Sequence, residues 1–174
     1  MKAIYILLTK SETILSRLVH LITADDYTHV SISFDRELQE MYSSSRKNGR
    51  TMFPAGPCRE NLRGGYYERH QHIPCAVYKL TVSDETYDDV RWEVEWIMAN
   101  SARCHFNILG LLLCRLNIPF HREKHFFCSQ FVSEVLTRSR AVRLPKDTTL
   151  MRPIDYMRLP ELVCMFRGRI SEYI

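Results

Sequence analysis

Apolar and polar residues alternate or run together in short segments that are typical of β-strands. These patterns predict strands over residues 3–8, 28–34, 38–43, 75–80 and 162–166. The turn residues Asp35-Arg36-Glu37 separate the second and third of these segments. We therefore expect residues 28–43 to form a β-hairpin.

A second pattern, with apolar residues three and four positions apart, predicts helices. The first begins at Ser11 as N-cap and carries an apolar stripe to Ile22. The second is capped by Ser83 and reaches about residue 101. A third covers about residues 107–116, and a fourth begins at Cys128, where apolar residues stand at 128, 131, 132, 135 and 136.

The pattern is lost between residues 44 and 72, where glycine, proline and charged residues indicate a long loop. Two further strands are compatible with residues 51–53 and 66–67. The whole chain, residues 1–174, is predicted to be one domain of the α+β class, an antiparallel β-sheet packed against helices.

The composition limits the partners and the cellular compartment that we expect for this protein. The net charge of +4 is spread along the chain and gives no reason to expect a nucleic acid partner. No apolar run is long enough for a spanning helix, and the short run at the start is followed by Lys10 and Glu12, so we expect neither stable membrane insertion nor a signal peptide. Six cysteines without regular spacing favour reduced thiols in a cytoplasmic protein. The sequence does not determine the oligomeric state.

Cys128 and His29 are candidates for a catalytic pair. A thiol in the first turn of a helix is near free N–H groups and a partial positive charge, which favour the thiolate. His29 lies on the polar face of its strand with Ser31 and Ser33, opposite Val30, Ile32 and Phe34. Taken singly, a cysteine on an apolar stripe is more often a core residue, and a strand histidine more often a structural one.

A catalytic histidine needs a third group that orients it. The next strand supplies Glu40 as its only acid, with Ser43 as the alternative. An oxyanion would be stabilised by backbone N–H groups at the start of the Cys128 helix, and Tyr5 or Gln130 are side-chain candidates.

The segments Tyr27–Asp35, Glu40–Ser43 and Phe126–Val132, in that order, resemble the NlpC/P60 superfamily of papain-like cysteine hydrolases. The histidine precedes the cysteine, as in the circularly permuted YiiX-like and lecithin:retinol acyltransferase-like branch. The resemblance implies a small papain-like sheet and thiol chemistry on amide or ester bonds. It also implies Cys128 as nucleophile, His29 as base and Glu40 as the third residue, with Ser43 as fallback.

The leading hypothesis is a cysteine peptidase or amidase that acts on a peptide or a cell-wall-type fragment and needs no cofactor. The alternatives are a lipid or thioester acyltransferase of the same superfamily and a non-catalytic binding module. A metal site made of His70, His72 and Cys58 or Cys75 is disfavoured, because the ligand spacing of known zinc sites is missing.

Overall fold

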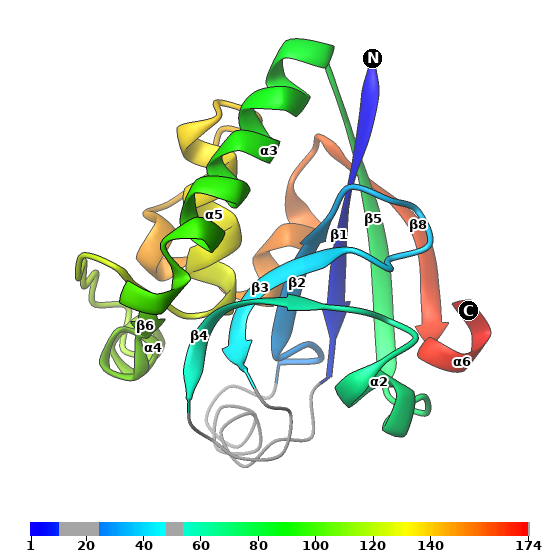
Figure 1. Cartoon of the computed structure of the whole chain (residues 1–174), viewed down its shortest axis with the longest axis horizontal. Helices are drawn as coiled ribbons and strands as arrows, with labels where there is room; N and C mark the ends of the chain where they lie inside the picture. Colours follow the sequence, from blue (N-terminus) through cyan, green and yellow to red (C-terminus); the bar gives the residue numbers. More distant parts are fainter. Residues whose placement is uncertain (11–24, 48–53, 174) are drawn as a thin grey trace.

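The computed structural model describes residues 1–10, 25–47 and 54–173 and has a mixed α+β fold (Figure 1). Its centre is a six-stranded antiparallel sheet with the strand order β4-β3-β2-β1-β5-β8. The strands are β1 (Lys2–Thr9), β2 (His29–Ser33), β3 (Met41–Arg46), β4 (Ala55–Glu60), β5 (Pro74–Val82) and β8 (Leu162–Arg169).

Both faces of the sheet are covered, since β1 directs apolar side chains to each side. Ile4, Ile6 and Leu8 point into the larger cluster, which also contains Val30 and Ile32 of β2. Leu7 points into the smaller cluster on the other face. This double burial explains why β1 is apolar almost throughout rather than alternating.

Helices α3 (Asp84–Ala99) and α5 (Cys128–Arg138) lie together beside the larger cluster (Figure 1). The shorter helices α2 (Gly65–Arg69) and α6 (Ile170–Tyr173) supply Tyr67 and Ile170 to the smaller cluster. Ser83 caps α3, as predicted, by accepting a hydrogen bond from the backbone N–H of Thr86.

Two short strands that the sequence did not predict lead into the remaining helices. β6 (His105–Phe106) pairs in parallel with β7 (His125–Phe126). α4 (Ile108–Arg115) follows β6 closely, and α5 follows β7. The pairing therefore brings the start of α4 to the start of α5.

The strands predicted at residues 3–8, 28–34, 75–80 and 162–166 are confirmed, with boundaries that differ by a few residues. The third strand lies at Met41–Arg46, displaced toward the C-terminus of the predicted range 38–43, although its hairpin with β2 is confirmed. The expected long loop contains β4, and residues 66–67 belong to α2 rather than to a strand. The predicted helix from Ser11 to Ile22 and strand 51–53 lie outside the described residues.

Within the three described ranges, no helix has both the length and the apolar character needed to cross a membrane. All six cysteines fall in these ranges, and all are free thiols.

Candidate active site

Cys128 is the first residue of α5, and the two residues before it are held in place by buried contacts. Phe127 before it is fully buried, and Ser44 of β3 donates a 2.6 Å hydrogen bond to the backbone carbonyl of Phe126. The N-cap residue Phe127 provides no side-chain hydrogen bond to the first turn. The first-turn N–H groups are therefore not capped by that side chain and point toward the region of the thiol.

The sulfur of Cys128 lies against the edge of β2 that faces β3. The β2–β3 ladder consists of Ile32 with Tyr42 and Ser33 with Met41, so it ends before the first residues of β2. Sγ lies 4.0 Å from the backbone carbonyl of Thr28 and also interacts with the backbone N–H of Val30. The thiol thus occupies the edge of β2 beyond the end of the ladder.

His29 lies between these two residues in the sequence, and its side chain is close enough to Cys128 for each group to shift the pKa of the other. Its Nε2 atom lies 3.1 Å and 3.2 Å from the two carboxylate oxygens of Glu60, at the end of β4. The histidine therefore connects the thiol to a carboxylate, and both His29 and Glu60 side chains are only 13% exposed.

The Glu60 carboxylate is held by hydroxyl groups from three other elements. Ser31 of β2 donates to Oε2 at 2.6 Å, and Ser45 of β3 donates to Oε1 at 2.7 Å. The hydroxyl of Tyr67 from α2 lies 3.4 Å from Oε2. A buried carboxylate whose two oxygens each accept such bonds is stabilised in its ionised form and in one orientation.

Electrostatics favour an ion pair over neutral partners throughout this array. Burial opposes the charge on each group, but the His29–Glu60 attraction and the hydrogen bonds around it prevail. They lower the pKa of Glu60 to about 2 and raise the pKa of His29 well above its ordinary value. Burial likewise raises the pKa of Cys128, but the nearby His29 side chain and its charge, with the N–H groups of Val30 and Ser129, give a net lowering. The thiol is therefore set up to ionise against a protonated imidazole.

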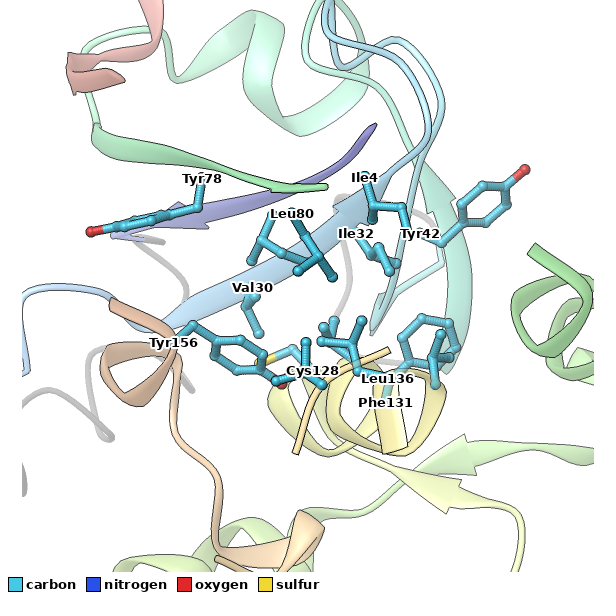
Figure 2. Close-up of a cluster of buried hydrophobic side chains, with 14 of the residues drawn as sticks. Ile4, Val30, Ile32, Tyr42, Tyr78, Leu80, Cys128, Phe131, Leu136 and Tyr156 are labelled. Atoms are coloured by element: carbon cyan, nitrogen blue, oxygen red, sulfur yellow. The ribbon is translucent and has the colours of Figure 1, made fainter. Parts of the chain in front are cut away.

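Tyr156 fixes the first turn of α5 beside the sulfur. Figure 2 shows its ring next to Cys128, on the side of the sheet toward which Val30 and Ile32 point. Its hydroxyl donates to the backbone carbonyl of Ser129 at 2.8 Å and lies 2.7 Å from the hydroxyl of Ser133. This contact joins the 3-10 helix Pro153–Arg158 to the helix that carries the thiol.

The structure brings Cys128 and His29 together but gives the third position to a different acid from the one predicted. Glu40 accepts a hydrogen bond from Tyr42 and lies 3.7 Å from a guanidinium nitrogen of Arg59. Ser43, the alternative, donates to the backbone carbonyl of Val30 at 2.7 Å. Neither residue is placed on His29, so the choice of Glu40 and the fallback to Ser43 are corrected to Glu60.

The two side-chain oxyanion candidates also differ in position. Tyr5 pairs with Ser33, four residues along β2 from His29, and packs against the smaller cluster, so the structure does not bring it to Cys128. Gln130 is buried in the first turn of α5, where its carbonyl oxygen accepts a 3.2 Å hydrogen bond from Asn107 at the start of α4. An oxyanion role for Gln130 stays a prediction.

The sequence does not indicate a role for Glu60, because β4 does not have the pattern of a strand. It contains Gly56 and Pro57, which are usual in loops, and its one charged pair is Arg59-Glu60. Pro57 is tolerated because β4 is an edge strand of the sheet. No period in the sequence distinguishes Glu60 from other loop acids.

The histidines considered as metal ligands have other contacts. His70 stacks on the ring of Tyr66 and makes a 2.8 Å hydrogen bond to its backbone carbonyl through Nδ1. Across the described ranges, no group of three or more histidine, cysteine or acidic side chains is arranged to hold a metal ion.

No family model matches this chain, and no curated sequence shows a significant match to it. Its function is therefore inferred from the array around Cys128 and from the sequence segments that contain Cys128 and His29.

Proposed function

We propose that the protein is a cysteine hydrolase of the permuted NlpC/P60 type, which cleaves an amide bond through an acyl-enzyme on Cys128. One observation supports the proposal above the others: the side chain of His29 lies beside the thiol of Cys128 and binds the buried carboxylate of Glu60 through Nε2. A nucleophile, a base and a group that orients the base are the parts that thiol catalysis requires.

In the first half-reaction, the thiolate of Cys128 attacks the carbonyl carbon of the substrate. The tetrahedral oxyanion is stabilised by uncapped N–H groups at the start of α5. Protonated His29 then donates its proton to the leaving nitrogen, so the C–N bond breaks and an amine departs. The acyl group remains on sulfur as a thioester.

In the second half-reaction, neutral His29 takes a proton from water, and the resulting hydroxide attacks the thioester. The C–S bond breaks, the carboxylic acid leaves, and the proton on His29 restores the starting ion pair. Glu60 is a positioning residue in both halves, since it touches His29 and stabilises its charged form without contacting the substrate.

We place this activity in the cytoplasm. A reduced thiol is required at Cys128, and the five other cysteines are also free. A reducing compartment maintains all six in that state.

An activated ester tests the chemistry without knowledge of the natural substrate. With p-nitrophenyl acetate, we expect a stoichiometric burst of p-nitrophenol and an acetyl group on Cys128 that mass spectrometry detects. Cys128→Ala and His29→Ala should abolish the burst, whereas Cys58→Ala should retain it, because burial raises the pKa of Cys58 to about 12. Acetylation that persists in Cys128→Ala would refute the assignment of the nucleophile. Addition of amines to the acetylated protein then distinguishes hydrolysis from transfer to another acceptor.

A further inference from the structure

Helix α3 presents an aromatic and acidic stripe to solvent. Trp92 and Trp96, the two tryptophans of the chain, are 60% and 46% exposed. Glu85 and Asp89 share their side of the helix, because residues 85, 89, 92 and 96 are separated by four, three and four positions. The opposite side carries the buried residues Val90, Val94 and Ile97. We call Glu85, Asp89, Trp92 and Trp96 the tryptophan stripe.

The acids of this stripe differ from the other acids of α3. Four α3 carboxylates have cationic partners: Asp84 pairs with the N-terminus, Asp88 with Lys2, Glu93 with Arg138 and Glu95 with Arg91. Glu85 and Asp89 are exposed and form no ion pair with any residue that the structure describes. Two exposed tryptophans beside two unpaired carboxylates are suited to a partner that is both apolar and basic.

Helix α4 and the turn after it present a surface of that kind. Leu109 and Leu112 lie on the outer side of α4, Leu116 is its C-cap residue, and Ile118 follows; they are 40–68% exposed. Leu111 and Cys114 occupy the inner side and pack against Phe127. We call the four exposed residues the leucine stripe.

The surroundings of the leucine stripe are basic. Arg103 precedes α4 and Arg122 and Lys124 follow it, all three exposed. Between residues 101 and 125 the sequence contains a single acid, Glu123. Arg115 is different, since its guanidinium is buried against Asp25. No ion pair to a described residue involves the side chain of Arg122 or Lys124.

We propose that these two stripes bind each other between two copies of the chain. The tryptophan stripe of one copy would contact the leucine stripe of the other, and a twofold axis would repeat the contact in the opposite direction. The opposite charges around the stripes favour this pairing and disfavour contacts between like stripes. An anionic membrane fits the leucine stripe alone and would repel the acidic tryptophan stripe, so a second copy accounts for more of the surface.

Sedimentation equilibrium over a wide range of protein concentrations tests the pairing. We expect a reversible dimer, with a blue shift of tryptophan emission as it forms, because both tryptophans become buried. Trp96→Ala should weaken dimerisation about 30-fold, as for a central interface tryptophan. Val163→Ser, on an exposed apolar residue of β8, is the matched control and should leave it unchanged.

Charge reversal separates a lost interface from a damaged fold. Glu85→Lys with Asp89→Lys makes both stripes basic, and Arg122→Glu with Lys124→Glu makes both acidic. Each double variant should be monomeric, and mixing the two should give a heterodimer. A wild-type chain that stays monomeric, or a mixture that does not associate, would overturn the proposal. The proposal would also be overturned if the protein is a monomer that binds phosphatidylglycerol vesicles and Leu112→Glu abolishes this binding. That result would show that the leucine stripe contacts a membrane.

Discussion

The carboxylate of Glu60 lies 3.1 Å from Nε2 of His29, although the two residues come from strands that are not neighbours in the sheet. β3 lies between them and contributes Ser45, which donates to the same carboxylate oxygen. The acid therefore reaches the histidine across an intervening strand. As a result, His29 and Glu60 form a buried ion pair beside the thiol of Cys128.

The first prediction concerns the reactivity of Cys128. We expect iodoacetamide to modify Cys128 faster than Cys114 at neutral pH, because His29 lowers the pKa of Cys128 while burial raises the pKa of Cys114. The rate at Cys128 should rise with pH through an apparent pKa below the ordinary thiol value of about 8.5. Peptide mapping by mass spectrometry measures both rates.

His29→Ala is the control for this profile. It should move the apparent pKa of Cys128 upward, since burial then acts without the imidazolium. Equal rates at Cys128 and Cys114, or a profile that His29→Ala leaves unchanged, would contradict the pairing.

The second prediction separates Glu60 from Glu40. Glu60→Gln should reduce the burst rate with p-nitrophenyl acetate about 100-fold, because His29 is no longer held in its charged form once the carboxylate of Glu60 is removed. It should also shift the rising limb of the pH profile upward. Glu40→Gln removes an acid bonded to Tyr42 and Arg59 and should alter neither quantity.

Glu60→Asp adds a test of position. It keeps the charge on a shorter side chain and should restore part of the pH profile while leaving the rate below wild type. If Glu40→Gln reproduces the loss and Glu60→Gln does not, the carboxylate assignment is wrong.

The parts of the site that follow a local period could be predicted, and the part that depends on strand pairing could not. The spacing of apolar residues placed Cys128 in the first turn of a helix, and the alternation of residues 29–34 placed Ser31 on the side of His29, where its hydroxyl lies 3.3 Å from Nε2. Glu60 depends on the register of β4 against β3, in a segment that contains Gly56 and Pro57. A short strand with glycine, proline and polar residues specifies its register only weakly.

The same reasoning explains the outcome for the sheet and the helices. Strands β1, β2 and β5 are buried on both faces or alternate regularly, so the pattern of apolar residues in their sequences predicts them as strands. α2 is five residues long and has one buried residue, Tyr67, so no helical stripe can appear in its sequence.

The third prediction is that protonation of Glu60 in acid lowers the free energy of unfolding. Its pKa in the folded protein is about 2, below the 4.5 of the free side chain. The ionised group therefore stabilises the fold fully above pH 4.5, and this contribution is lost as the pH falls toward 2. The shift corresponds to about 3 kcal/mol, counted once for the His29–Glu60 pair.

Urea unfolding of wild type and Glu60→Gln measures this contribution. The difference in unfolding free energy between the two proteins should be largest near neutral pH and should shrink below pH 4.5. In a His29→Gln background the pH dependence of that difference should be smaller, because the main attraction is gone. A difference that stays constant from neutral pH to pH 2 would show that Glu60 is not held ionised.

The fourth prediction concerns Tyr156, which is fully buried and joins the 3-10 helix Pro153–Arg158 to α5. Tyr156→Phe removes a hydroxyl and leaves the carbonyl of Ser129 and the hydroxyl of Ser133 without this partner. Loss of such a buried hydrogen bond costs about 1–3 kcal/mol of unfolding free energy. Because Ser129 follows the nucleophile directly, we also expect slower alkylation of Cys128.

Tyr173→Phe is the matched control. Its hydroxyl donates to the carbonyl of Arg36 at an exposed position, so the change in stability should stay within about 0.5 kcal/mol and the alkylation rate should be unaffected. Urea unfolding and iodoacetamide labelling of both variants give the comparison. If Tyr156→Phe is as stable as Tyr173→Phe, the hydroxyl does not anchor α5. If it is less stable but labels Cys128 at the wild-type rate, its contact stabilises the fold without positioning the thiol.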